Sequence, residues 1–335
     1  MSYRARRVRV LALVLGALAL LASGTTVSWA KTEFRLSNQL PPSHHISKGL
    51  VLFAGKVKEY SKGAIEVKVF DSAQLYKDTE IVEALQEGLI ESGLVPVNKW
   101  SGMIPAADVF EMPFIYKDLS SIKKFIDAGA GELLDKEFQK RAVKTLFWVD
   151  YGYIQFFNNK RPLTKPDDFK GLTMRSFSSG DADTLKALGA APTVMSSSEM
   201  YMALQRGTVD GATTGMPAAV SRKVQEVQKF MTEANYTTAQ FVMQANLKWW
   251  EKLPQDQRDA ILKAGREAEE WIRGAIAQSE DEAKKVIQKA GVQIHALTPE
   301  ARPLFIKATE PVRETFANKS GDLAKKLIDI ALSLK

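Results

Sequence analysis

The segment that most constrains the fold runs from Gln255 to about Ala290, where the residue pattern is strongly helical and contains no proline. A helix of this length is about threefold longer than the average globular helix of ~11–12 residues. At ~1.5 Å per residue it spans on the order of 50 Å, which exceeds the diameter of one small domain. We therefore expect one helix that braces two lobes of the chain.

The rest of the chain alternates short strand patterns with helix patterns. Phe34 and Leu36 mark an alternating strand, a helix pattern follows from about Ile46 to Ser61, and a second strand pattern covers residues 65–69. The second half repeats this order. Such alternation is typical of parallel β-sheet built from βαβ units, so the sequence predicts the α/β fold class.

Two extended hydrophobic runs, at residues 147–157 and 240–247, are long enough to cross between two sheets. The first contains Gly152. With the long helix, these runs predict two lobes joined by crossing segments. The expected boundaries are residues 31–152 plus about 241–280 for lobe I, and residues 153–240 plus about 281–335 for lobe II.

Residues 1–30 have the three parts of a secretory signal peptide. Four arginines and no acid come first, an apolar run follows over residues 10–22, and Ser28 and Ala30 place small residues at −3 and −1. The apolar run is shorter than the roughly 20 residues of a spanning helix. We expect a cut after Ala30 and export from the cytoplasm. Nothing after the Arg6-Arg7 pair strengthens a twin-Arg signal, so the Sec route is favoured.

The net charge of +7 comes mostly from that leader, because removing residues 1–30 leaves +3. The remaining chain has no block of excess Lys and Arg, so no nucleic-acid partner is expected. No cysteine is present, which excludes thiol nucleophiles, disulfides and Cys-ligated metals. His44 and His45 are adjacent and His295 is distant, so we expect no metal site and no cofactor. Neither a nucleophile elbow nor a phosphate-binding loop occurs, and no enzyme is predicted.

Six stretches, in order, carry a family resemblance. They are LPPSHHISKGL (40–50), AQLYKDTEIVEALQEGLIESGLV (73–95), EMPFIYKD (111–118), LTKPDDFKGLTMRS (163–176), EMYMALQRGTVDGATTG (199–215) and NLKWWEKLP (246–254). From about Phe34 to Leu334, the chain resembles the solute-binding subunits of TRAP (tripartite ATP-independent periplasmic) transporters, the DctP-type family. The resemblance implies a periplasmic-binding-protein-like fold whose two lobes close on a ligand in the periplasm.

Arg175 is the leading site residue. It ends a strand pattern at an edge where side chains face a cleft between lobes. A guanidinium can hold a carboxylate through two parallel hydrogen bonds. From the residues alone, a salt bridge at the surface or between lobes is the favoured interpretation. The family's carboxylate-binding arginine maps onto Arg175, so the resemblance implies that role here.

Ile154 marks a departure from part of the family. Members that bind sugar acids, and many that bind dicarboxylates, have a second ligand-facing arginine at this place, after Gly-Phe. An unpaired second carboxylate would cost several kcal/mol. We therefore expect an apolar or aromatic monocarboxylate, provided that no other Arg or Lys substitutes.

The other candidate ligand contacts follow strands or lie in the crossing segments. Tyr153 and Phe156 are also compatible with the core, Asn158 with a structural turn, and Thr213 and Thr214 with ordinary strand residues. The candidates are Tyr153, Phe156, Asn158, Thr213, Thr214, Gln39, Asn98, Tyr236 and Phe241.

The sequence thus predicts a periplasmic protein that captures an organic acid by hinge closure and delivers it to a TRAP permease in the membrane. One alternative is a ligand-loaded sensor subunit that docks on a membrane receptor. Another is an ABC-type binding protein, which the long helix and the ordered stretches disfavour.

Overall fold

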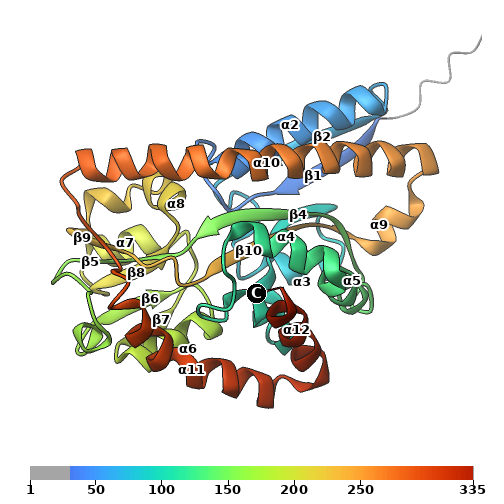
Figure 1. The fold of residues 1–335 in the computed structure, drawn as a ribbon. Coiled ribbons are helices and arrows are strands. Elements are labelled where there is room, and N and C mark those ends of the chain that lie inside the picture. The colour runs from blue at the N-terminus through green and yellow to red at the C-terminus, as the bar shows by residue number, and fades with distance from the viewer. Residues whose placement is uncertain (1–30, 335) are drawn as a thin grey trace, which may run out of the picture. The chain divides into compact units, whose positions relative to one another are not determined.

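The computed structural model describes residues 31–334. The expected signal peptide and its cut after Ala30 lie outside these residues. Within them, the chain from Glu33 onward forms one compact unit. Two β-sheets with helices packed around them confirm the α/β class and the two-lobed fold (Figure 1).

The first lobe is built on a five-stranded sheet that mixes parallel and antiparallel pairs. β1 and β3 are parallel, whereas β10 runs antiparallel to both of its neighbours, β3 and β4. Helix α2 (His45–Tyr60) joins β1 to β2, as a βαβ unit requires. In spatial order the strands are β2 (Ile65–Phe70), β1 (Thr32–Ser37), β3 (Ser92–Pro96), β10 (Thr238–Asn246) and β4 (Val143–Tyr153).

The second lobe is built on a six-stranded sheet. β6 is parallel to β7 and β8, while β5 pairs antiparallel with β8 and β9. β4 ends at Tyr153 in the first sheet and β5 begins at Gln155 in the second, so the expected crossing run does cross. The strands, in spatial order, are β11 (Gln293–Ala296), β9 (Phe230–Glu233), β5 (Gln155–Asn158), β8 (Gly211–Thr214), β6 (Thr173–Ser176) and β7 (Ala191–Val194).

Helix α10 (Gln255–Lys289) is one continuous helix of 35 residues, as expected. It packs on α2 and β4 of the first lobe and on α8 (Met216–Ser221) of the second. Figure 1 shows it running past both lobes. Its buried face includes Ile261 and Ile272, and Gly49 of α2 lets Ile272 approach closely. The expectation that this helix braces two lobes is confirmed.

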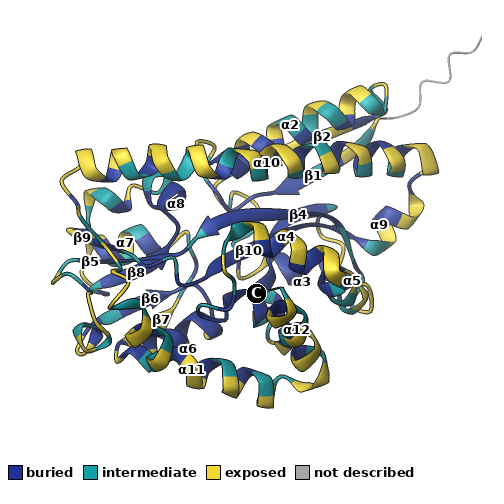
Figure 2. Cartoon of the chain, viewed as in Figure 1, coloured by how far each residue is buried: buried dark blue, intermediate teal, exposed yellow. Residues whose placement is uncertain are grey.

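The remaining helices lie around the sheets, with buried residues on one side and exposed residues on the other (Figure 2). Apart from η3, which is a π-helical turn, the short η elements are 3-10 helices. The helices are α3 (Ile81–Gln86), η1 (Val97–Trp100), η2 (Pro105–Glu111), α4 (Leu119–Phe125), η3 (Ile126–Ala130), α5 (Gly131–Gln139), η4 (Pro166–Phe169), α6 (Ser179–Leu188), α7 (Met200–Gln205), η5 (Val224–Glu226), α9 (Leu247–Lys252), α11 (Arg302–Lys319) and α12 (Gly321–Ser333).

Helix α12 departs from the expected lobe assignment. Its apolar face, including Ala324 and Leu327, is buried in the same core cluster as Val95 and Val242 of the first sheet. Helix α11 contacts α6 of the second lobe instead. The chain after α10 is therefore shared between the lobes, whereas we expected residues 281–335 to belong to lobe II alone. The other boundaries stay predictions.

Gly274 offers a test of how helix α10 contributes to stability. It is exposed in the helix interior, and a Cβ there would meet no atom within 4 Å. Because glycine costs about 1 kcal/mol relative to alanine inside a helix, we expect Gly274→Ala to raise the free energy of unfolding by about 0.5–1 kcal/mol. Urea denaturation measures this. The control Gly49→Ala should lower stability, since its Cβ would lie 2.2 Å from Ile272 Cγ1. Equal effects of the two changes would contradict the packing described for α10.

Candidate ligand-binding site

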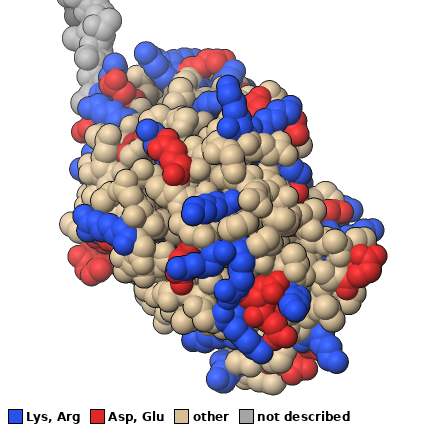
Figure 3. Space-filling view, turned by 90° about the vertical axis from the view of Figure 1, so that its left-hand side faces the viewer, with Lys and Arg blue, Asp and Glu red and all other residues tan. Residues whose placement is uncertain are grey.

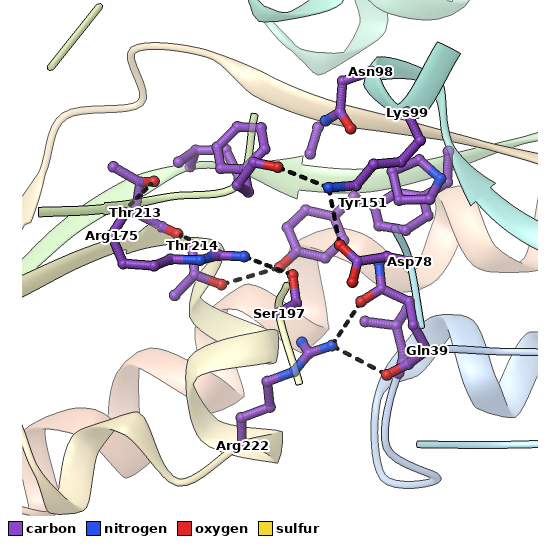
Figure 4. A pocket seen from close by; sticks show the side chains of 16 residues that line it. Gln39, Asp78, Asn98, Lys99, Tyr151, Arg175, Ser197, Thr213, Thr214 and Arg222 are labelled. Atoms are coloured by element: carbon purple, nitrogen blue, oxygen red, sulfur yellow. Dashed lines mark hydrogen bonds and ion pairs between the residues drawn. The ribbon is translucent and has the colours of Figure 1, made fainter. Parts of the chain in front are cut away.

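A small pocket lies between the two sheets. The first lobe contributes Asn98 and Lys99 from η1 and Tyr151 from β4, and the second lobe contributes Arg175 from β6 and Thr213 from β8 (Figure 4). The pocket therefore forms where strand ends of both sheets meet, as is usual for ligand sites in α/β folds.

Arg175 is buried in the wall of this pocket, with 1% of its surface exposed. Its guanidinium donates to the carbonyl oxygens of Thr213 (3.0 Å) and Met195 (3.1 Å) and to Ser197 Oγ (2.8 Å). All three acceptors are neutral, and within residues 31–334 neither an ion pair nor a partner for its Nε is present. Burial lowers the pKa of Arg175, while nearby Asp78 opposes that shift. The guanidinium of Arg175 can therefore still donate charge-assisted hydrogen bonds to an anion in the pocket.

Lys99 and Asp78 form an ion pair at the pocket, with Nζ and Oδ2 3.0 Å apart. Lys99 also donates to the carbonyl of Phe177 across the lobes (2.9 Å), and Ser196 donates to Asp78. Burial raises the pKa of Asp78, but Lys99 and Ser196 more than offset it, so the pKa lies below the usual value. The positive charge of Lys99 and the negative charge of Asp78 therefore neutralise each other.

Arg222 follows helix α8 and points toward Gln39 of the first lobe (Figure 4). One of its terminal nitrogens donates to both the main-chain oxygen (3.2 Å) and the Oε1 (3.0 Å) of Gln39. Burial lowers the pKa of Arg222, and Tyr151 and Asp78 oppose that shift. Sequence reasoning missed this residue, because in Ser221-Arg222-Lys223 nothing distinguishes it from a solvated charge. The same reasoning missed Lys99 and Asp78.

Six of the ten expected site residues line the pocket together. Asn98 donates its amide to Glu111, which leaves its Oδ1 without a partner in the described chain. Thr214 Oγ1 lies 3.2 Å from the hydroxyl of Tyr151, whose ring stacks on Phe241. The six are Gln39, Asn98, Arg175, Thr213, Thr214 and Phe241.

The other four expected residues do not line the pocket. Tyr236 and Phe156 stack on each other with centroids 4.3 Å apart inside the core, and Tyr236 donates to Asp181. Asn158 accepts from the main-chain N–H groups of Lys160 and Arg161, and so shapes a turn. Tyr153 presents its main-chain N–H to Glu280 of α10 (2.9 Å).

Gly152 changes which side chains of the crossing segment line the pocket. Its φ of 107° breaks the two-residue alternation of side chains along the strand. Tyr151 and Ile154 line the pocket as a result, whereas Tyr153 does not. A strictly alternating strand would not place residues 151 and 154 on one side.

A further polar contact joins the lobes beside the pocket. Glu111 of η2 accepts from Ser178, which caps helix α6 of the second lobe. Burial raises the pKa of Glu111 well above its usual value, and burial raises that of the neighbouring Asp108 to about 6. Together with Arg222–Gln39 and Lys99–Phe177, this contact holds the lobes against each other.

The histidine pair is buried and neutral. His44 and His45 stack with ring centroids 4.5 Å apart, and burial lowers the pKa of His44 well below its usual value and that of His45 to about 4. Within the described chain, no group of three or more His, Asp or Glu residues is arranged to hold a metal ion.

The exterior is mixed in charge. On the face shown in Figure 3, Lys and Arg are interspersed with Asp and Glu. Many are paired at the surface, as in Lys285–Asp281 (2.8 Å). Among residues 31–334, no helix combines the length and apolar character needed to cross a membrane.

Two α/β lobes that enclose a pocket with a buried, unpaired arginine define the class of two-lobed solute-binding proteins. The model of the family described as bacterial extracellular solute-binding protein, family 7 (DctP) matches residues 36–320. The chain belongs to this family, as the resemblance implied.

Similar proteins agree with this membership. The C4-dicarboxylate-binding periplasmic protein DctP of Rhodobacter capsulatus is 32% identical over 317 residues, covering 93% of this chain and 95% of that protein. A TRAP periplasmic solute-binding protein from Sulfurospirillum deleyianum, solved with bound succinate, is 29% identical with a TM-score of 0.86, covering 91% and 100%. The sugar acid binding protein of Advenella mimigardefordensis, in complex with galactonate, is 25% identical with a TM-score of 0.87, covering 91% and 99%.

Proposed function

We propose that this protein captures a small organic acid in the periplasm and delivers it to a TRAP permease, without catalysing a reaction. The observation that carries the proposal is Arg175, a buried guanidinium at the pocket with only neutral acceptors among the described residues. An anion in this pocket replaces the lost hydration of that cation, which is the main cost of burying it.

Closure of the lobes is the mechanism we propose for capture. Arg175 and Thr213 belong to the second lobe, and Asn98 and Phe241 to the first. A ligand that touches both sides binds the closed state better than the open state, so it shifts the equilibrium toward closure. Release to the permease then requires that this equilibrium be reversed.

The relatives support an acidic ligand. Their names and bound molecules include C4-dicarboxylates, succinate and galactonate, and all of these carry a carboxylate. Export through a signal peptide cut after Ala30 accords with a periplasmic site of action, and it remains a prediction.

The finer preference for a monocarboxylate rested on a condition that does not hold. It required that no other Arg or Lys reach the cleft, but Lys99 and Arg222 both line it. Ile154 also lines the pocket, yet its apolar side chain alone no longer decides how many carboxylates the ligand carries.

A screen of acids against their own amides tests the proposed function. Thermal denaturation with and without succinate, benzoate, galactonate and pyroglutamate, followed by calorimetry of the hits, should find at least one acid that stabilises the protein. Its uncharged amide should not, because only the carboxylate compensates Arg175. Mass spectrometry should recover the bound acid chemically unchanged. If neutral solutes bound and no acid did, the proposal would be wrong.

A further inference from the structure

The charged side chains around the pocket do not balance. Lys99 and Asp78 pair with each other at 3.0 Å, so their charges cancel. Arg175 and Arg222 are the other charged residues that line the pocket within the described chain, and both are cations. Asp181 lies behind Arg175 and acts on it electrostatically, but neither guanidinium forms an ion pair with a carboxylate of the described residues. Both are therefore available to an anion in the pocket.

Arg222 is placed to meet a ligand as well as Gln39. It lines this pocket and also an outer groove with an empty volume of about 650 Å³, and Gln39 and Ser197 border the same two spaces. Its side chain donates to the neutral oxygens of Gln39, and in residues 31–334 no acid pairs with it. Arg222 therefore stands where the pocket meets the outside, in the same lobe as Arg175 but on a different element.

A ligand with one negative charge leaves one of these guanidinium groups uncompensated. Removing a cation from water without an opposite charge is costly, and the two arginines also repel each other. A ligand with two acidic groups removes both costs, because each group accepts charge-assisted hydrogen bonds from one arginine. The apolar side chains of Ile154, Ala239 and Phe241 line the same pocket and can contact the carbon skeleton between the two acids.

We propose that Arg222 is a second anion-binding residue that selects ligands with two acidic groups, one held by Arg175 and the other by Arg222. The inference rests on the proposed function, since it assigns a second contact to the same ligand. It makes Arg222 a specificity-determining residue in addition to its contact with Gln39.

Matched pairs of diacids and mono-amides test this role. Calorimetry would compare succinate with succinamate, glutarate with glutaramate, and phthalate with phthalamate, on the wild type and on Arg222→Met. We expect at least one diacid to bind the wild type about 30-fold or more tightly than its mono-amide, the range for losing one charged partner. In Arg222→Met this ratio should fall to below about threefold, with the mono-amide affinity nearly unchanged.

Arg206→Met is the matched control. It removes the same charge from an exposed arginine beyond the end of α7, which lines neither the pocket nor the outer groove, and it should keep the diacid preference. If Arg222→Met weakened diacid and mono-amide equally, Arg222 would serve lobe closure alone and the inference would be wrong. A wild type that binds monoacids but prefers no diacid would also overturn the inference, while the proposed function would stand. Binding of neither kind of acid would overturn both.

Discussion

The variant Arg175→Ala is expected to lose roughly 30-fold to several thousand-fold in affinity for the bound acid, which corresponds to about 2–5 kcal/mol. The reason is that the guanidinium is fully buried and its neutral partners leave it to be compensated by the ligand. Isothermal titration calorimetry with an acid identified by thermal denaturation measures the loss directly.

Two further variants separate ligand binding from folding. Arg175→Lys keeps the charge but not the planar fork, so its affinity should lie between those of the wild type and the alanine variant. Arg206→Ala removes an exposed arginine from beyond the end of α7 and should bind normally. Wild-type affinity in a folded Arg175→Ala protein would show that the carboxylate is held elsewhere.

The second large effect is expected on stability, at the contact between α10 and the crossing strand β4. Asp150 of β4 is 3% exposed, and it accepts from Arg273 Nε (2.6 Å) and Gln240 Nε2 (2.8 Å). Arg273→Ala leaves this carboxylate buried without its cation. We expect the free energy of unfolding to fall by about 3–5 kcal/mol, measured by urea denaturation of the ligand-free protein.

Charge removal at Asp150 provides the control. In the double variant Asp150→Asn/Arg273→Ala, much of the lost stability should return, because no buried charge is left unpaired. Lys285→Ala, which breaks the exposed pair with Asp281 on the same helix, should leave stability unchanged within error. Equal losses for Arg273→Ala and Lys285→Ala would mean that the buried pair does not hold the helix to the strand.

Much of the fold could be predicted because it depends on local patterns. The apolar spacing and the absence of proline predicted α10, and the extended run at residues 147–157 predicted the crossing from β4 to β5. The second run, at residues 240–247, was expected to cross as well, but β10 belongs to the first sheet alone. The helix expected from about Ile46 to Ser61 is α2, His45–Tyr60.

The pocket could be predicted only in part, because it depends on contacts between distant segments. Arg175 and Thr213 could be predicted as ligand contacts because the resemblance to the family covers the strand patterns that contain them. Arg222 lies 183 residues from Gln39 along the chain, and no local sequence pattern predicts the hydrogen bond between them. Tyr151 was also missed. Gly152, with its positive φ, leaves Tyr151 and Ile154 lining the pocket while the predicted Tyr153 does not.

The order of strands in the first sheet has a consequence for how the chain acquires its structure. β4 lies at the edge and pairs only with β10, which is made after the whole strand series from β5 to β9. A nascent chain that ends before Thr238 lacks β10 and therefore cannot complete the sheet of the first lobe. Pairing over so large a sequence separation is slow, because the loop between the strands must be closed before any contact is gained. The first lobe is therefore assembled from segments distant in sequence, and a fragment that ends before β10 lacks an interior strand of its sheet.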